Sequence, residues 1–378
     1  MDLKDIRNHI DEIDDQMLSL FLERMACSEE VAKYKKEHGL PILNRARERE
    51  ILEKVREKSG DKELYTHQFF TTLMNLSKAS QSEYLTGDTQ IKELTEKMLS
   101  SEESVFPKTG MVACQGVEGG NSQVAADRLF PRGNLIFVKT FEAVFQAVDS
   151  GLCKYGVVPI ENSSNGSVRA VYELMQKYRF SILRSTRLWI HHTLLAKPNT
   201  KLEDIRTIYS HEQAIGQCSA YLNSLKNVQI IPCENTASAA KAVADSSDPH
   251  CAAIASSPCA ELYGLDVLSD RIQDSENNYT RFICISKEPK MYEGADHISL
   301  IVSCDHRPGA LHEILSKPAA LGINMIKLES CPVSGRNFEF IFFIELEASL
   351  KEPGVIPMLE ELERSSQELI LLGNYDEV

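Results

Sequence analysis

The first stretch of the chain repeats apolar side chains every three or four positions over residues 3–37. The repeat consists of Ile6, Ile10, Ile13, Met17 and Phe21. This spacing predicts a single helix of roughly 50 Å, at about 1.5 Å per residue, which Gly39-Leu40-Pro41 ends. Because such a helix is too long to be buried inside a domain of this size, we expect it to pack against a second copy of the chain in a dimer.

Two further helices are predicted before residue 88. One follows Pro41, with Ile51, Leu52 and Val55 on its buried side, and the other spans about 64–85. Residues 89–108 are polar and helix-prone and run into Pro107-Lys108-Thr109-Gly110, so we expect a linker there. The prediction for this part is an all-helical domain over 1–88, followed by a linker over 89–108.

Between residues 109 and 287 short apolar runs alternate with helical stretches, which is typical of an α/β domain. A separate set of strands and helices over about 190–270 predicts a second lobe, and the chain would return to the first lobe through Thr280–Ser286. Two lobes favour a site in the cleft between them. The expected strands are Gly110–Cys114, Leu135–Val138, Tyr155–Ile160, Ile208–Ser210, Gln229–Pro232 and Cys251–Ala255.

The last part, residues 296–375, follows the order strand, helix, strand, strand, helix, strand. That order predicts an α+β domain of the ferredoxin-like (βαββαβ) kind. The expected strands are His297–Ser303, Met325–Pro332, Phe338–Glu345 and Glu368–Tyr375, and the expected helices are Gly309–Leu321 and Pro353–Ser365. The fold class is therefore multidomain, with all-α, α/β and α+β parts in that order.

The composition of the chain argues against some classes of binding partner. The chain has 378 residues, enough for two or three domains, and a net charge of −14 without a dense Lys/Arg stripe. This argues against a nucleic-acid partner and means that an anionic substrate must be met by locally placed cations. Ten scattered cysteines without a CxxC pair, no apolar signal core and no run of membrane-spanning length favour a cytoplasmic protein that does not bind membranes. We expect no metal site.

Polar residues follow the apolar run Tyr155–Ile160 directly, as Glu161, Asn162, Ser163 and Ser164. In open α/β sheets ligands bind beyond the carboxyl ends of strands, and a helix starting there would favour a small anion. Taken alone, the segment is better explained as a capped junction between a strand and a helix.

Two more segments of this kind, Tyr209–Cys218 and Asn277–Ile285, complete a set of three. Together they resemble the prephenate dehydratase family, through Val-Val-Pro-Ile-Glu-Asn, Tyr-Ser-His…Gln-Cys and Thr-Arg-Phe. The resemblance implies that Thr280 is catalytic, with a hydroxyl that assists the leaving hydroxide, and that Arg281 pairs with a substrate carboxylate. The substrate-binding residues that it implies are Glu161, Asn162, Ser163, Ser210, Gln217, Arg281 and Phe282.

Two cations lie on the apolar stripe of the first helix, Arg24 and Lys35. Such residues are rarely buried unpaired, so they indicate an internal anion, unless they reach solvent or pair with a glutamate. The helical part resembles the all-helical chorismate mutase family. The resemblance implies that Lys35 and Gln81 act on the substrate's ether oxygen and that Arg7 reaches into the partner subunit's site. The implied substrate-binding residues are Arg7, Arg24, Asn44, Arg47, Glu48 and Ser77.

The C-terminal domain has two further motifs. Gly309-Ala310-Leu311 and Glu329-Ser330-Cys331-Pro332 resemble the phenylalanine-binding motifs Gly-Ala-Leu and Glu-Ser-Arg-Pro of ACT domains. The resemblance implies an allosteric site for L-phenylalanine at Gly309, Ala310, Leu311, Glu329 and Ser330. Since Cys331 replaces the usual arginine, we expect weaker inhibition than in relatives that have it.

As a whole the chain resembles bifunctional chorismate mutase–prephenate dehydratases with a C-terminal ACT domain. The resemblance implies conversion of chorismate to prephenate and then to phenylpyruvate, in phenylalanine biosynthesis, without a cofactor, in a homodimer that could pair further into a homotetramer. Two alternatives remain open. One is a two-lobed sensor of small anions, and the other is a mutase fused to prephenate dehydrogenase, which needs a nicotinamide site for which the sequence has no fingerprint.

Overall fold

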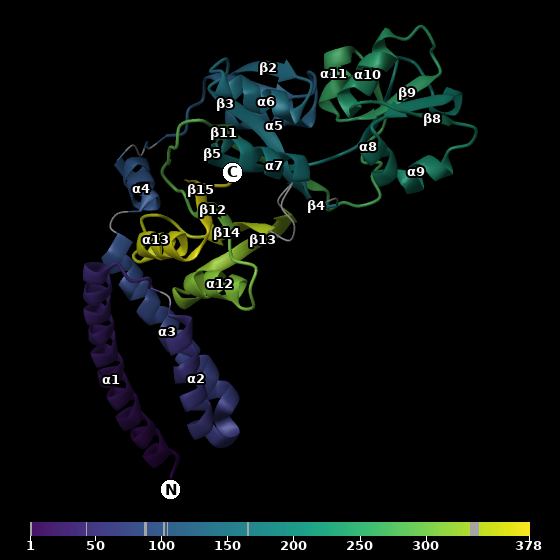
Figure 1. Cartoon of the computed structure of the whole chain (residues 1–378). Coiled ribbons are helices and arrows are strands. Elements are labelled where there is room, and N and C mark those ends of the chain that lie inside the picture. The colour runs from purple at the N-terminus through teal and green to yellow at the C-terminus, as the bar shows by residue number, and fades with distance from the viewer. Residues whose placement is uncertain are drawn as a thin grey trace.

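The computed structural model describes residues 2–42, 44–86, 89–100, 103, 105–164, 166–332 and 340–378. Three parts follow one another in space (Figure 1). A helical N-terminal part lies at one end and two α/β sheets lie at the other, while the C-terminal sheet and its helices lie between them. Within the described ranges, no helix combines the length and apolar character needed to cross a membrane.

The N-terminal part consists of helices, as predicted. They are α1 (Leu3–His38), α2 (Arg45–Ser59), the short 3-10 helix η1 (Gly60–Lys62) and α3 (Glu63–Thr86). Helix α1 ends at Gly39, which adopts a left-handed φ of 63° that suits a residue without Cβ. Of the 36 residues of α1, a single chain buries only Ser28 and Ala32. The predicted apolar stripe is therefore largely uncovered, with Ile10 49% exposed.

The segment 89–108 is more than the linker expected from the sequence. It contains helix α4 (Gln90–Ser100), whose Ile91 and Met98 are 3% and 1% exposed and belong to the apolar core of the C-terminal part. The backbone N–H of Ile91 also donates to Glu363 at 3.1 Å. The seven-residue spacing of Ile91 and Met98 puts both on one face, so a covered helix was available from the sequence.

The first α/β sheet has the strand order β2-β1-β3-β11-β5, with β4 paired to β3. Strands β2 and β3 run parallel to β1, whereas β11 is antiparallel to both β3 and β5. The strands are β1 (Met111–Gln115), β2 (Asn134–Val138), β3 (Tyr155–Asn162), β4 (Gly166–Ser167), β5 (Ser181–Trp189) and β11 (Tyr279–Ser286). The accompanying helices are α5 (Asn121–Leu129), α6 (Phe141–Asp149) and α7 (Arg169–Tyr178).

A second sheet, of order β10-β6-β9-β7-β8, forms the second lobe. The chain enters it after β5 and returns to the first sheet as β11, as the sequence predicted. Its strands are β6 (Thr193–Ala196), β7 (Thr207–Ser210), β8 (Gln229–Pro232), β9 (Cys251–Ala255) and β10 (Asp266–Ser269). Its helices are η2 (Leu202–Asp204), α8 (Glu212–Gln217), α9 (Ser219–Ser224), α10 (Thr236–Asp245) and α11 (Pro258–Tyr263).

The C-terminal part has the predicted element order, and its antiparallel sheet has the order β13-β14-β12-β15. The elements are β12 (His297–Ser303), α12 (Ala310–Ala320), β13 (Asn324–Pro332), β14 (Phe340–Glu347), α13 (Val355–Ser365) and β15 (Glu368–Tyr375). Residues 338–339, where the third strand was expected to begin, lie outside the described residues.

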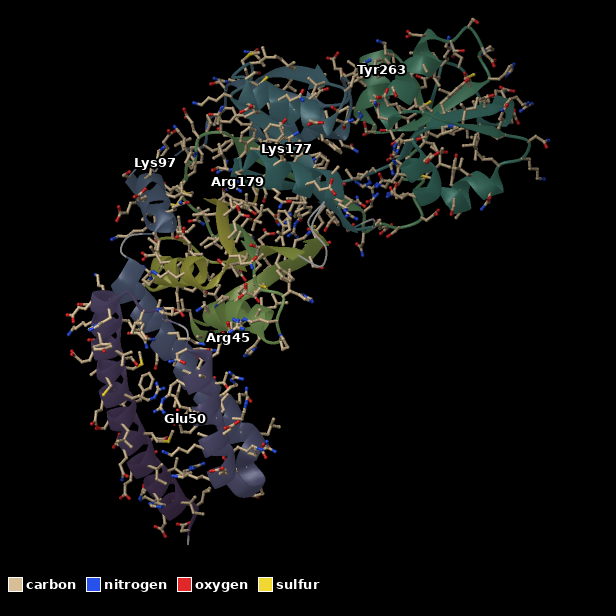
Figure 2. The ribbon with its side chains drawn as sticks, in the orientation of Figure 1. Arg45, Glu50, Lys97, Lys177, Arg179 and Tyr263 are labelled. Atoms are coloured by element: carbon tan, nitrogen blue, oxygen red, sulfur yellow. The ribbon has the colours of Figure 1, made fainter. Side chains whose placement is uncertain are left out.

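One face of this sheet packs on the first α/β lobe. Their shared apolar core includes Ile283 of β11 and Phe343 of β14. Gly373 of β15 lies so close to β5 that an added Cβ would stand 2.2 Å from the carbonyl oxygen of Ile182. Arg179, which follows α7 and is labelled in Figure 2, forms an ion pair with Glu368 of β15. The C-terminal sheet is therefore fixed against the lobe by both close packing and charge.

Candidate active sites

Helices α1 and α3 pack along each other and bring together four of the residues expected for mutase chemistry. Arg24 donates to the hydroxyl of Ser77 and, at 3.1 Å, to the carbonyl oxygen of Leu73. Lys35 Nζ donates to Gln81 Oε1 at 3.0 Å and to the carbonyl oxygen of Ile42 at 2.6 Å. All four acceptors are neutral, so the two cations keep their positive charge available for an anion.

The surroundings of these cations are partly desolvated. Ser77 and Gln81 are 6% and 8% exposed, and burial lowers the pKa of Lys35, which the nearby Glu48 partly opposes. Glu48 itself forms an ion pair with Lys78 at 2.9 Å. In such a place a bound anion interacts more strongly with a cation than it would in water.

Of three further residues expected in this site, one lies far along α1 and two have contacts within the start of α2. Arg7 is exposed, 17 residues before Arg24 and thus about 26 Å away along the helix. Arg47 is exposed and pairs with Glu50 at 2.8 Å. The side-chain oxygen of Asn44 accepts the backbone N–H of Arg47 at 3.1 Å as the N-cap of α2, a role that the sequence expectation did not include.

On the first α/β sheet, Thr280 of β11 lies directly opposite Asn162 of β3. Asn162 Nδ2 donates to Thr280 Oγ1 at 2.9 Å and to Asn278 Oδ1 at 3.0 Å. Because the threonine oxygen accepts this bond, its own hydroxyl proton remains available for another acceptor. The arrangement therefore suits Thr280 as a hydrogen-bond or proton donor.

The hydrogen bonds continue from Asn278 into the second lobe. Gln217 Oε1, at the end of α8, lies 2.8 Å from both Asn278 Nδ2 and His192 Nε2. Since that oxygen is an acceptor, the proton of the imidazole must sit on Nε2. Burial lowers the pKa of His192, against the raising effect of the Gln217 bond, so the ring is neutral at neutral pH. Gln217 Nε2 is buried without a partner among the described residues, which leaves it free to donate to a ligand.

His192 and Asn278 belong to this network, although the sequence motifs did not single them out. Asn278 stands two residues before Thr280 in the segment Asn277–Ile285, and His192 follows another histidine, His191. The only signal in the sequence was the polar character of these positions beside strand-like runs. Their contact with Gln217 joins two lobes and depends on the tertiary fold.

Two serines expected to bind substrate are engaged with the backbone. Ser163 Oγ donates to the carbonyl oxygen of Asn277 at 2.8 Å and accepts the N–H of Tyr279 at 2.9 Å, which fixes the entry to β11. Ser210 is fully buried and donates to the carbonyl oxygen of Ile254 at 2.8 Å.

The expected helix start after Asn162 was wrong, because β4 intervenes and α7 begins only at Arg169.

Arg281, Glu161 and Phe282 do not join the Thr280 network. Arg281 donates from both terminal nitrogens to Glu345 of β14, at 2.6 Å each, and Glu161 Oε2 lies on the same side, 3.5 Å from it. Successive side chains of a strand point to opposite faces, so Arg281 faces away from Thr280. Phe282 is 2% exposed in the apolar core of the sheet. Arg281 is thus paired with Glu345 and Phe282 is buried, and the expected contacts of both residues with substrate stay predictions.

The expected allosteric residues occupy two elements of the C-terminal part. Gly309 is the N-cap of α12 with a left-handed φ of 83°, Ala310 is buried and Leu311 is half-buried. On β13, Ser330 is exposed, while Glu329 Oε2 accepts a hydrogen bond from Ser167 of β4 at 3.0 Å. One of the two motifs therefore touches the α/β lobe of its own chain.

Comparison with known proteins assigns both halves of the chain. The family model "Chorismate mutase type II" matches residues 6–82, and the family model "Prephenate dehydratase" matches residues 112–290. These ranges coincide with the helical part and the two α/β sheets.

Three relatives extend the match. A protein of Escherichia coli (strain K12) named bifunctional chorismate mutase/prephenate dehydratase is 31% identical over 98% of this chain and 95% of its own length. An Arabidopsis thaliana protein named arogenate dehydratase/prephenate dehydratase 1, chloroplastic, is 36% identical over 75% of this chain and 76% of its own. The solved prephenate dehydratase of Arthrobacter aurescens in complex with L-Phe is 29% identical, covers 70% of this chain and 89% of its own, and has a TM-score of 0.65. With two family matches and full-length relatives that join both activities, the chain belongs to the family of bifunctional chorismate mutase/prephenate dehydratase enzymes of phenylalanine biosynthesis.

Proposed function

We propose that residues 1–88 rearrange chorismate to prephenate, with Lys35 and Gln81 as the catalytic pair. The reaction is a pericyclic shift, so the protein must hold a compact conformer and stabilise charge on the breaking ether bond. The hydrogen bond between Lys35 Nζ and Gln81 Oε1 supports this role, because it places the two side chains where one oxygen of a ligand could meet both. Arg24, together with Ser77, is the proposed partner of a substrate carboxylate.

Residues 109–287 are proposed to dehydrate and decarboxylate the prephenate, with Thr280 as the catalytic group. Prephenate loses its ring hydroxyl and its carboxylate as CO₂, which leaves phenylpyruvate, and the departing oxygen needs a donor. The observation that carries this proposal is the bond from Asn162 Nδ2 to Thr280 Oγ1, since it directs the threonine proton away from Asn162. Gln217 Nε2 is the proposed donor that orients the substrate, and His192 and Asn278 hold its oxygen in place.

Residues 296–375 are proposed to form a ferredoxin-like ACT domain that binds L-phenylalanine and inhibits the dehydratase. The order of elements, βαββαβ, supports this fold. The N-terminus of α12, next to Gly309, favours a bound carboxylate. The related Arthrobacter aurescens enzyme was solved in complex with L-Phe. Cys331, at the place of the arginine in the resembled motif Glu-Ser-Arg-Pro, is 8% exposed and packs in the core shared with the α/β lobe. We therefore propose binding that is weaker than in relatives with the arginine.

The active assembly is proposed to be a homodimer formed through α1, and pairing of dimers remains open. Large apolar residues such as Ile6, Ile10 and Ile13 are 41%, 49% and 42% exposed on this helix, and leaving such a stripe in water costs free energy. Arg7 lies too far from Arg24 to reach the same site in one chain, whereas a partner's helix could supply it.

The variant Thr280→Ala should lose dehydratase activity by a factor on the order of 10² or more, because a positioned donor is removed. Its mutase activity should stay normal, since the proposed mutase site lies in the N-terminal helices α1 and α3. Phenylpyruvate absorbance with prephenate as substrate measures the first activity, and chorismate consumption measures the second. The variant Thr280→Ser keeps a hydroxyl and should retain much of the dehydratase rate. Normal dehydration by Thr280→Ala would exclude the proposed role.

The variants Lys35→Ala and Gln81→Ala should show the opposite split. Each removes a group proposed to act on charge that develops in the transition state, so chorismate turnover should fall by about 10²-fold or more. Prephenate supplied directly should still be dehydrated at the normal rate. Lys33→Ala is the matched control, because Lys33 lies on the same helix but pairs with Glu30 at the surface. A mutase rate like that of wild type in either variant would show that the site is misassigned.

The variant Ile10→Asp should shift the full-length protein from dimer to monomer, because it places a charge in the proposed interface. Sedimentation velocity of wild type and variant measures the change. Leu202→Asp, which alters an apolar residue of the second lobe that is 40% exposed, should leave the dimer intact. A wild-type protein that sediments as an active monomer would refute the dimer.

Titration calorimetry with L-phenylalanine, run beside dehydratase assays, tests the regulatory proposal. Heat of binding and loss of phenylpyruvate formation should appear over the same range of ligand concentration. L-alanine serves as the control, because it has the same backbone groups but no ring. If millimolar phenylalanine gives neither heat nor inhibition, the domain does not sense this amino acid.

A further inference from the structure

Strand β11 faces two parts of the protein at once. Its register with β3 pairs Thr280 with Asn162 and Arg281 with Glu161. Because side chains alternate along a strand, the first pair points toward the proposed dehydratase site and the second toward the C-terminal sheet. Any force on the Arg281 side chain therefore acts on the residue next to Thr280.

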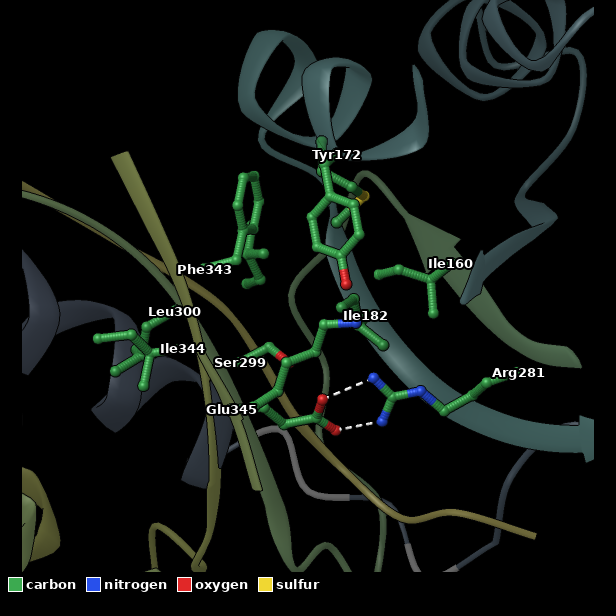
Figure 3. A pocket seen from close by; sticks show the side chains of 12 residues that line it. Ile160, Tyr172, Ile182, Arg281, Ser299, Leu300, Phe343, Ile344 and Glu345 are labelled. Atoms are coloured by element: carbon green, nitrogen blue, oxygen red, sulfur yellow. Dashed lines mark hydrogen bonds and ion pairs between the residues drawn. The ribbon is translucent and has the colours of Figure 1, made fainter. Parts of the chain in front are cut away.

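Arg281 is held by Glu345 in a two-pronged ion pair. Both terminal nitrogens lie 2.6 Å from the two carboxylate oxygens, as the dashed lines in Figure 3 show. The side chains are 7% and 5% exposed, and Tyr375 Oη also donates to Glu345 Oε1, at 3.1 Å. This planar geometry fixes direction as well as distance, unlike a contact between a point charge and a carboxylate.

Both members of the pair remain ionised. Burial alone would raise the pKa of Glu345, but the hydrogen bonds and charge of Arg281 outweigh it and hold that pKa below its ordinary value. The pair borders a small cavity of about 20 Å³, room for one water-sized molecule, with apolar neighbours such as Phe343 and Ile160 (Figure 3). The ion pair is therefore largely shielded from solvent. In such surroundings water weakens the attraction between two charges least.

A second set of contacts joins the C-terminal sheet to the first α/β lobe. Glu161 Oε2 lies 3.1 Å from Lys327 Nζ of β13, and Glu329, two residues further along β13, accepts the bond from Ser167. Strand β13 thus contacts β3 and β4 beside Asn162, while β14 holds β11 beside Thr280. The two strands that present Asn162 and Thr280 are each tied to the C-terminal sheet.

We propose that Glu345 is a positioning residue of the dehydratase, which sets the place of Thr280 through Arg281. The inference deepens the proposed function and rests on the catalytic role of Thr280. Removing the carboxylate charge takes away the two short bonds of the buried guanidinium and leaves it only the longer contacts with Glu161 at 3.5 Å and Glu377 at 4.0 Å. The strand must then shift for the guanidinium to pair more closely with them or to be hydrated. A displacement of Thr280 by a fraction of an ångström affects a transition-state contact more than it affects binding of the substrate.

The test is the full-length variant Glu345→Gln, with Glu347→Gln as control. Glu347 lies two residues along the same strand but is exposed. The kcat of Glu345→Gln for prephenate should fall by about ten- to a hundred-fold with KM nearly unchanged, while chorismate turnover by the same sample stays normal. Glu347→Gln should match wild type in both activities. A normal dehydratase kcat in Glu345→Gln, or a parallel loss of both activities, would overturn the proposal.

A double variant covers the case in which Glu345→Gln does not fold. Arg281→Met combined with Glu345→Leu replaces the ion pair by apolar groups of similar volume, which is often neutral for stability. We expect a folded protein with normal mutase activity and a lowered dehydratase kcat. If this protein dehydrates prephenate at the wild-type rate, the ion pair serves only stability. If the double variant is fully active and Thr280→Ala is inactive, only the positioning role of Glu345 is rejected. If Thr280→Ala is also active, the proposed catalytic role of Thr280 is rejected.

Discussion

The alternation of side chains along β11 is the constraint on which the arrangement of this enzyme depends. Thr280 and Arg281 are neighbours in sequence, yet one joins Asn162 in a network of neutral polar groups and the other joins Glu345 in a buried ion pair. The neutral network around Thr280 and the ion pair of Arg281 thus lie on opposite faces of the same sheet. Thr280 and the residue that attaches the C-terminal sheet are therefore neighbours on one strand, which is the basis of the positioning role proposed for Glu345.

The C-terminal sheet is tied into the first α/β lobe by more than this pair. Asp376 accepts two hydrogen bonds from Arg184 at 2.7 Å each, and the chain terminus continues along β5. A buried ion pair adds little net stability, but breaking one partner costs several kcal/mol, on the order of 3–5. The interface is therefore specific in geometry, and it resists partial rearrangement more than an apolar contact of the same size.

The C-terminal part also contacts helices that precede the α/β lobes. Helix α4 places Ile91 and Met98 in its core, and Asn75 of α3 lies 3.5 Å from Glu313 of α12. Arg307, just before the Gly309 motif, holds Glu313 at 2.6 Å. The C-terminal part thus lies between the two proposed active sites (Figure 1).

Most helices and strands, and the kinds of side chain proposed for both sites, could be predicted from the sequence, whereas only the folded chain shows which face of an element each residue occupies. Apolar periodicity is a local property, so the long first helix, the two lobes and the C-terminal order of elements were predictable, as was the meeting of Lys35 with Gln81 from helix faces and family resemblance. Which strand packs on which sheet depends on contacts between residues far apart in the chain, such as Arg281 with Glu345, 64 positions apart. For that reason the sequence did not predict the pairing of Arg281 with Glu345, missed His192 and Asn278, and predicted a linker where α4 lies. Side-chain type limits what a residue can do, but the partner that burial and packing bring to it determines what it does.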